Sequence, residues 1–125
     1  MSHFTTIQTQ IKDLEALRAA VAELGLTLIP NAEARGYVQN KVRGEYVLRL
    51  KGPYDVALNK QPDGTYGLTT DWWRGCVAHE VGENYGRLLQ LYGVHKATRE
   101  ARRAGYLVRR QPQTNGSIKL TLSAV

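Results

Sequence analysis

The stretch MSHFTTIQTQI, residues 1–11, places a β-branched segment directly ahead of an amphipathic one. Its three threonines and two isoleucines favour a strand over residues 5–11, since side chains branched at Cβ suit a pleated backbone. Asp13 is a suitable N-cap, and apolar residues then recur at helical spacing until Gly25, which predicts a helix over residues 14–24. We therefore expect the fold to begin at the first residue, with no targeting segment.

Strand signals continue after this helix. An apolar strand over residues 26–29 is expected to end at Pro30, and a short one lies near residues 37–38. Alternating apolar and polar residues mark three closely spaced segments, residues 45–50, 54–58 and 66–70. The Gly-Pro and Pro-Asp-Gly sequences between them are typical of tight turns, so these segments predict an antiparallel meander with one buried face.

The C-terminal part predicts a helix followed by a hairpin. Helical spacing runs from Gly82 to Ala104, and strands over residues 106–111 and 117–123 flank Asn115–Gly116, a strong two-residue turn signal. With 125 residues the chain predicts one α+β domain, residues 1–125, in which two α-helices pack on one face of an antiparallel β-sheet. No apolar run is long enough for a membrane helix, and a single cysteine suits a reducing compartment, so we expect a soluble cytoplasmic protein.

The C-terminal helix carries two apolar stripes that point in different directions. One consists of Tyr85, Leu88, Leu89 and Tyr92; the other consists of Val94, Ala97, Ala101 and Ala104. At about 100° per residue the stripes lie roughly 150° apart, so one straight helix cannot bury both against a flat sheet. Either the helix breaks near Gly93, or one stripe contacts a protein partner. In the second case the predicted docking surface is Tyr85, Leu88, Tyr92, Lys96, Arg99 and Arg103.

The net charge of +6 offers an alternative partner. Arg102, Arg103, Arg109 and Arg110 form a basic cluster that could contact RNA or DNA. Trp72 and Trp73 are adjacent, so on a strand one ring would face outward and could stack on a base. Alternatively, the basic cluster is a charged, solvent-exposed surface that binds no partner.

One group of three residues could form a catalytic or metal-binding site. Cys76, His79 and Glu83 would share one face of a helix, as a nucleophile set or as zinc ligands, which makes a thiol or zinc hydrolase a remote alternative. Nucleotide-binding loops, paired cysteines and nucleophile elbows do not occur in the sequence. We expect no enzyme, no cofactor and no metal site.

Several motifs resemble a known family. They are the opening MSHFT, Thr9-Gln10-Ile11, Leu14, Leu17, Leu24-Gly25, Arg35-Gly36-Tyr37, Tyr54-Asp55-Val56, Tyr92 with His95, and Gly116-Ser117-Ile118-Lys119-Leu120. These are similar to a family of small uncharacterised proteins of cyanobacteria and red-algal plastids, called hypothetical chloroplast reading frame thirty-five. The resemblance implies no catalytic or cofactor-binding residue. Relatives encoded near an ATPase of the AAA class imply an accessory subunit. We therefore expect a non-enzymatic binding module, an adaptor or accessory subunit of a larger protein assembly.

Overall fold

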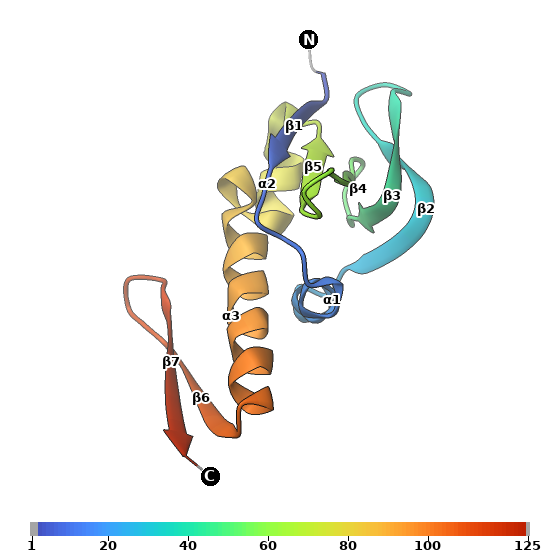
Figure 1. The fold of residues 1–125 in the computed structure, drawn as a ribbon. Helices are drawn as coiled ribbons and strands as arrows, with labels where there is room; N and C mark the ends of the chain where they lie inside the picture. The colour runs from blue at the N-terminus through green and yellow to red at the C-terminus, as the bar shows by residue number, and fades with distance from the viewer. Residues whose placement is uncertain (1–2, 125) are drawn as a thin grey trace.

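The computed structural model describes residues 3–124 and has the α+β architecture expected from the sequence (Figure 1). Its elements are β1 (Thr5–Gln8), α1 (Leu14–Glu23), β2 (Thr27–Arg35), β3 (Lys41–Arg49), β4 (Val56–Lys60), β5 (Tyr66–Thr70), the 3₁₀ turn η1 (Trp73–Gly75), α2 (Cys76–Val81), the 3₁₀ turn η2 (Glu83–Tyr85), α3 (Gly86–Arg103), β6 (Tyr106–Pro112) and β7 (Ile118–Ala124). Met1 and Ser2, where we expected the fold to begin, lie outside the described residues. No helix among residues 3–124 is long and apolar enough to cross a membrane.

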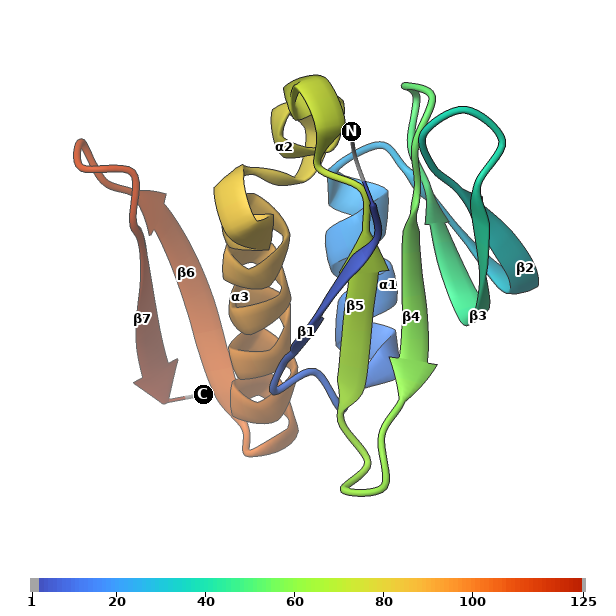
Figure 2. The ribbon, with the colours of Figure 1, turned by 90° about the horizontal axis from the view of Figure 1, so that it is seen from above.

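The main sheet has five antiparallel strands in the order β1-β5-β4-β3-β2. Figure 2 shows α1 behind this sheet and α3 beside it. The core lies between these layers, where sheet residues such as Leu48, Leu58 and Leu68 pack with Leu17 of α1 and Leu88 of α3. The predicted meander and the helices on one face of the sheet are thus confirmed.

The N-terminal helix begins and ends as predicted. The Asp13 carboxylate accepts a hydrogen bond from the backbone N–H of Ala16 at 3.0 Å, which satisfies a free donor of the first turn. Gly25 follows the helix with φ of 74°, a conformation that glycine adopts without a Cβ penalty.

Several strand boundaries differ from the prediction: for example, β3 begins at Lys41 rather than at residue 45, and β4 covers Val56–Lys60 rather than residues 54–58. β1 ends at Gln8, because the Thr9 side chain turns back to bond the carbonyl of Tyr66 at 2.7 Å. β2 continues through Pro30 to Arg35, because it is an edge strand and a proline at the edge need not donate to a neighbour. Residues 37–38 belong to the loop between β2 and β3, not to a strand.

The helix α3 is unbroken, so the predicted break near Gly93 is wrong. It lies between the core and a separate two-stranded sheet formed by β6 and β7 (Figure 2). Tyr85, Leu88 and Tyr92 face the core, while Val94 is buried outside that core cluster. The hairpin packs against α3, and Ala97 and Ala104 of the second stripe stay exposed, so the helix needs no kink.

The segment between β5 and α3 has no clear apolar periodicity in the sequence. It forms two 3₁₀ turns around the short helix α2, and three non-glycine residues there adopt positive φ: Arg74, Asn84 and Tyr85. Trp72 and Trp73 sit at the first turn, not on a strand. Such backbone conformations are uncommon for non-glycine residues, which explains why no periodic pattern appears in this segment.

The Tyr85 hydroxyl is buried and has no hydrogen-bond partner among the described residues. Burial raises the pKa of this phenol. A buried polar group without a partner destabilises a fold, so Tyr85→Phe is expected to raise the free energy of unfolding by about 1 kcal/mol. Urea denaturation at neutral pH measures this change, and a loss of stability in the variant would contradict the prediction.

Tyr92 provides the matched control. Its hydroxyl oxygen accepts hydrogen bonds from the backbone N–H groups of Lys12 and Asp13, each at 3.0 Å. Tyr92→Phe leaves these two donors without their acceptor and is expected to lower the free energy of unfolding by about 1–2 kcal/mol. The same substitution should therefore act with opposite signs at Tyr85, the N-cap of α3, and at Tyr92 within α3.

Candidate functional site

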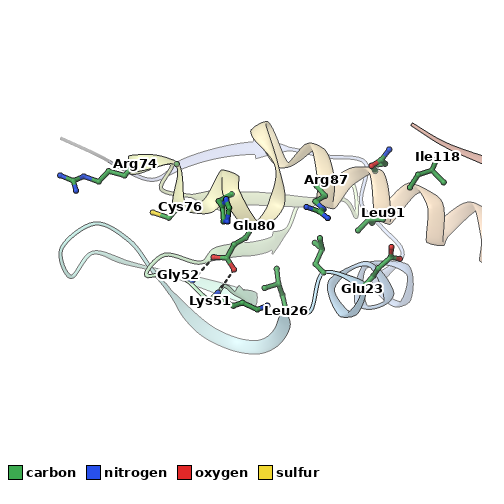
Figure 3. A pocket seen from close by; sticks show the side chains of 14 residues that line it. Glu23, Leu26, Lys51, Gly52, Arg74, Cys76, Glu80, Arg87, Leu91 and Ile118 are labelled. Atoms are coloured by element: carbon green, nitrogen blue, oxygen red, sulfur yellow. Dashed lines mark hydrogen bonds between the residues drawn. The ribbon is translucent and has the colours of Figure 1, made fainter. Parts of the chain in front are cut away.

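A groove of about 1060 Å³ lies between α2, the first turns of α3 and the loop that joins β3 to β4 (Figure 3). Residues 23–26, which follow on from the end of α1, and one residue of β7 complete its walls. Its lining residues are Glu23, Leu24, Leu26, Lys51, Gly52, Arg74, Gly75, Cys76, His79, Glu80, Arg87, Gln90, Leu91 and Ile118. Five separate parts of the chain thus meet here, and we call this site the α2 groove.

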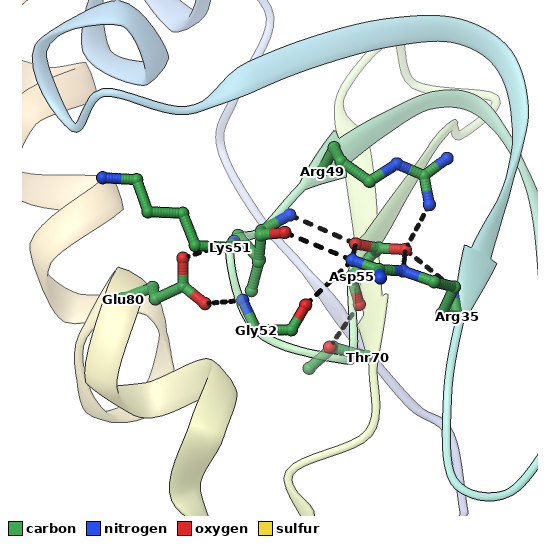
Figure 4. A network of polar contacts seen from close by, with 8 residues as sticks. Arg35, Arg49, Lys51, Gly52, Asp55, Thr70 and Glu80 are labelled. Atoms are coloured by element: carbon green, nitrogen blue, oxygen red, sulfur yellow. Dashed lines mark hydrogen bonds and ion pairs between the residues drawn. The ribbon is translucent and has the colours of Figure 1, made fainter.

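Glu80 fixes one wall of the α2 groove. Its Oε1 accepts a hydrogen bond from the backbone N–H of Lys51 at 2.7 Å, and its Oε2 accepts one from Gly52 at 2.9 Å (Figures 3 and 4). These are charge-assisted bonds, about twice as strong as neutral ones. The carboxylate of Glu80 therefore joins α2 to the β3–β4 loop.

A buried carboxylate holds the same loop from the other side (Figure 4). Asp55 is fully buried and accepts hydrogen bonds from the Arg35 guanidinium at 2.8 Å, from Arg49 at 2.7 Å and from the backbone N–H of Leu50 at 3.1 Å. Arg35 also donates to the carbonyl of Gly52 at 2.9 Å. Burial alone would raise the pKa of Asp55, but the hydrogen bonds from Arg35 and Leu50 outweigh it and hold this pKa below its usual range.

Glu23 closes the opposite end of the α2 groove. It accepts two hydrogen bonds from Arg110 of β6, at 3.1 and 2.7 Å, and one contact from His95 Nε2 of α3 at 2.7 Å. The Arg110 hydrogen bonds lower the pKa of Glu23, with a smaller contribution from His95. One carboxylate thereby ties α1 to both α3 and the C-terminal hairpin.

The cations of the α2 groove have no such partners. Among residues 3–124, no ion pair involves Lys51, Arg74 or Arg87, whereas Glu23 and Glu80 are both engaged within the protein. Figure 3 shows Lys51 and Arg87 on opposite sides of the groove and Arg74 at its end. The available charge of this concave surface is therefore positive.

The predicted docking surface on α3 is wrong in its apolar half. Tyr85, Leu88 and Tyr92 are buried in the core and cannot meet a partner. Of the three cations predicted beside them, Lys96 lies 3.8 Å from Glu100 and Arg99 lies 3.7 Å from Asp13, while Arg103 is exposed. The stripe that sequence analysis assigned to a partner is the one that faces the protein's own sheet and α1.

The four arginines of the predicted basic cluster do not form one free surface in the structure. Arg102, Arg103 and Arg109 are exposed, but Arg110 is bound to Glu23. The rings expected to stack on bases have internal partners: Trp72 contacts the Tyr85 ring edge-on at 4.7 Å, and Trp73 contacts Tyr37 in the same way at 5.6 Å between centroids. Neither tryptophan is the outward platform that the sequence analysis expected.

Cys76 and His79 both line the α2 groove, but Glu83 does not share their face. α2 ends at Val81, and Gly82, with φ of 88° and ψ of 162°, turns the chain before Glu83. Within residues 3–124 no cluster of three or more His, Cys, Asp or Glu side chains could hold a metal ion. The Cys76 thiol donates to the carbonyl of Trp73 at 3.2 Å.

Sequence reasoning missed the residues that shape this site. Gly52 belongs to the Gly-Pro turn sequence, and no motif in the sequence marks Lys51 or Glu80 as residues of a site. An acidic residue at the end of a turn between strands, such as Asp55, is a weak signal by itself. Its importance depends on two arginines that precede it in the sequence, Arg35 and Arg49, and that only the folded sheet brings together.

Comparison with known proteins gives the family of the chain. The model of the family described as "Protein of unknown function (DUF1257)" matches residues 20–121. The uncharacterized protein ycf35 of Pyropia yezoensis is 31% identical over 123 residues, which cover 96% of this chain and 94% of that protein. No solved structure matches. The resemblance predicted from the motifs is confirmed, and the chain belongs to the DUF1257 family.

Proposed function

We propose that this protein is a non-enzymatic binding module that holds an acidic segment of a protein partner in the α2 groove. The observation that carries this proposal is the division of charge inside the groove. Lys51, Arg74 and Arg87 have no ion-pair partner among the described residues, while the two acidic lining residues, Glu23 and Glu80, bind other parts of the fold. The groove therefore has positive charge to offer and little negative charge that would repel an acidic segment.

The other lining residues favour a peptide that carries apolar side chains as well. Leu24 and Leu26 of the link between α1 and β2, Leu91 of α3 and Ile118 of β7 line the groove. Pockets that bind ligands combine such apolar walls with a few polar groups that fix orientation. Acidic residues alternating with leucines would match both features.

Internal hydrogen bonds hold the β3–β4 side of the groove in place, which favours binding without a large ordering cost. Asp55 and Glu80 hold the β3–β4 loop through backbone hydrogen bonds, and Glu23 holds the hairpin. A preformed site loses less conformational entropy on binding than a mobile one does. This fits an adaptor or accessory subunit that presents one fixed surface to a larger assembly.

The test uses short fluorescent peptides in which glutamate alternates with leucine, and control peptides in which lysine replaces glutamate. Only the acidic peptides are expected to bind. Lys51→Gln combined with Arg87→Gln should weaken this binding by about tenfold or more, since each lost cation contributes on the order of 1 kcal/mol. Fluorescence anisotropy gives the dissociation constants.

The matched control is Arg102→Gln combined with Arg109→Gln. It removes the same charge from exposed residues that do not line the groove. We expect its affinity for the acidic peptides to stay within about twofold of the unmodified protein, because distant surface charges are largely screened. Equal losses in the two double variants would overturn the proposed groove.

A nucleic-acid partner is the second candidate, because Arg102, Arg103 and Arg109 are exposed and unpaired among the described residues. This function predicts the reverse pattern in the same variants. Affinity for mixed RNA and DNA would fall steeply with salt, and the Arg102/Arg109 double variant would bind less tightly than the Lys51/Arg87 one.

A further inference from the structure

The hairpin of β6 and β7 leaves one long strand edge without a neighbour. β7 pairs only with β6 in the described structure, and Figure 2 shows it as the outermost strand, beyond β6 and α3. It spans seven residues, Ile118–Ala124. A row of backbone donors and acceptors on such a strand is a template for pairing with another strand.

The other strand edges carry features that prevent pairing. β1 has four residues only. β2 contains Pro30, and the adjacent Asn31 has φ of 49°, which interrupts the extended backbone. β6 contains Pro112, which has no N–H to donate. Of the four strands at sheet edges in residues 3–124, β7 is the one that is long, free of proline and free of positive φ.

The alternation of hydrogen-bonded and non-hydrogen-bonded pairs between β6 and β7 shows which backbone groups of β7 face outward. Next to the turn, the N–H of Gln113 donates to the carbonyl of Ser117 at 2.8 Å, so these two residues form a hydrogen-bonded pair. Such pairs alternate along an antiparallel ladder. The backbone groups of Ile118, Leu120, Leu122 and Ala124 therefore point away from β6. Pro112 lies opposite Ile118, at a position where no donor toward β7 is needed.

We propose that β7 pairs antiparallel with β7 of a second copy of this chain, about a two-fold axis at Thr121, so that two hairpins form one four-stranded sheet. In this register Leu120 lies opposite Leu122 of the second copy, and Ile118 lies opposite its Ala124. Residues with outward backbone groups thus meet each other, as an antiparallel ladder requires. Centring on Thr121 is also the register that pairs all seven residues of β7.

The side chains of β7 are self-complementary in this register. Leu120 and Leu122 share the face of the hairpin that carries Val108, and they would form cross-strand apolar pairs. On the other face Thr121 meets its own copy, and Lys119 lies opposite Ser123. The two lysines are thereby kept apart, whereas centring on Lys119 would place like charges opposite each other.

Two exposed apolar side chains support the proposal. Leu122 is 49% exposed and Tyr106 is 43% exposed, and both lie on the same face of the hairpin near its open end. In the four-stranded sheet this end lies close to the two-fold axis, between the two copies of α3. A second copy would thus cover apolar surface that one chain leaves in water.

Sedimentation velocity over a range of protein concentrations tests the proposal with the chain alone, so its outcome does not depend on the acidic peptides. A dimer is expected. Leu122→Lys should weaken the dimer by at least about tenfold, because a charge would replace an apolar pair beside the axis. Leu107→Lys is the control: Leu107 is 60% exposed and lies on β6, on the opposite face of the hairpin. It should leave the dimer intact.

Cysteine cross-linking tests the register, in a Cys76→Ser background that removes the native thiol. Thr121→Cys should form a disulfide dimer under copper–phenanthroline oxidation, because the two copies of residue 121 face each other across the axis. Ser123→Cys should not, since its copies are four residues apart along the strands. A monomer at all concentrations, a dimer unaffected by Leu122→Lys, or equal cross-linking at both positions would each overturn the proposal.

Discussion

Replacing Asp55 with alanine is expected to lower the free energy of unfolding by about 2–4 kcal/mol, because the backbone N–H groups of Arg35 and Leu50 would lose their acceptor. The carboxylate is fully buried and binds two guanidinium groups, Arg35 and Arg49, as well as the backbone of Leu50. Without it, both arginines lose their shared counter-charge and the β3–β4 loop loses its anchor. Urea denaturation at pH 7 measures the change.

Asp63 supplies the control for this substitution. Its carboxylate also accepts hydrogen bonds, from the backbone and side chain of Thr65 at 3.0 and 2.6 Å, but it lies in an exposed turn and has no ion pair among the described residues. Asp63→Ala is expected to cost about 1 kcal/mol. If the two variants were equally stable, the buried network would not have the weight assigned to it.

The same carboxylate should make stability depend on pH. The pKa of Asp55 is lowered in the folded state, from an ordinary value of 3.8, so the ionised group stabilises the fold above that value. This contribution decreases as the pH falls through the lowered, folded pKa and protons bind. Asp55→Asn cannot titrate, so its stability should fall less steeply than that of the unmodified protein below about pH 4. Parallel curves would contradict the assigned pKa shift.

Gly82→Ala is expected to cost about 3 kcal/mol or more. Gly82 has φ of 88° and ψ of 162°, a conformation that is essentially restricted to glycine, and a Cβ there would lie 2.6 Å from the backbone nitrogen of Arg87. Because the clash is with backbone, rotation of a side chain cannot relieve it. α2 and α3 would have to separate, which would displace two walls of the α2 groove.

Gly86 is the matched control, four residues along. It has φ of −55° at the start of α3, and a Cβ there would meet nothing within 4 Å. Gly86→Ala should therefore raise the free energy of unfolding by about 0.5–1 kcal/mol, since alanine loses less conformational entropy in a helix. Thermal or urea denaturation of both variants gives the comparison. A mild effect of Gly82→Ala would show that the helix junction tolerates rearrangement.

Periodicity was a good guide to the regular elements of this chain. The alternation of Tyr46, Leu48 and Leu50 predicted β3, and the Asn115–Gly116 turn predicted the hairpin, because these signals are local. Pro30 was misleading since its effect depends on whether its strand is central or at an edge, and neighbours in a sheet are not visible in a sequence.

The candidate site was harder to predict because its parts are distant in sequence. The two stripes of α3 point in different directions, as predicted, but the helix needs neither a break nor a partner: Val94 of the second stripe is buried, whereas Ala97 and Ala104 are exposed, and the chain's own hairpin packs against α3. Likewise, the sequence predicted Arg110 to be available to a ligand, whereas its guanidinium binds Glu23, which lies 87 residues away in the sequence. Long-range pairing of this kind converts an apparent ligand-binding charge into an internal one.

The hairpin shares no strand with the five-stranded sheet; its described polar links to the rest of the molecule are the Arg110–Glu23 contacts and the bond from Gln90 to the carbonyl of Gly116. Its release would break these links and its side-chain packing on α3 and leave every hydrogen bond of the main sheet in place. We therefore expect the hairpin to behave as a separate, weaker cooperative unit, which supplies a wall of the groove through Ile118. Local opening of that unit would widen the entrance to the groove without unfolding the domain.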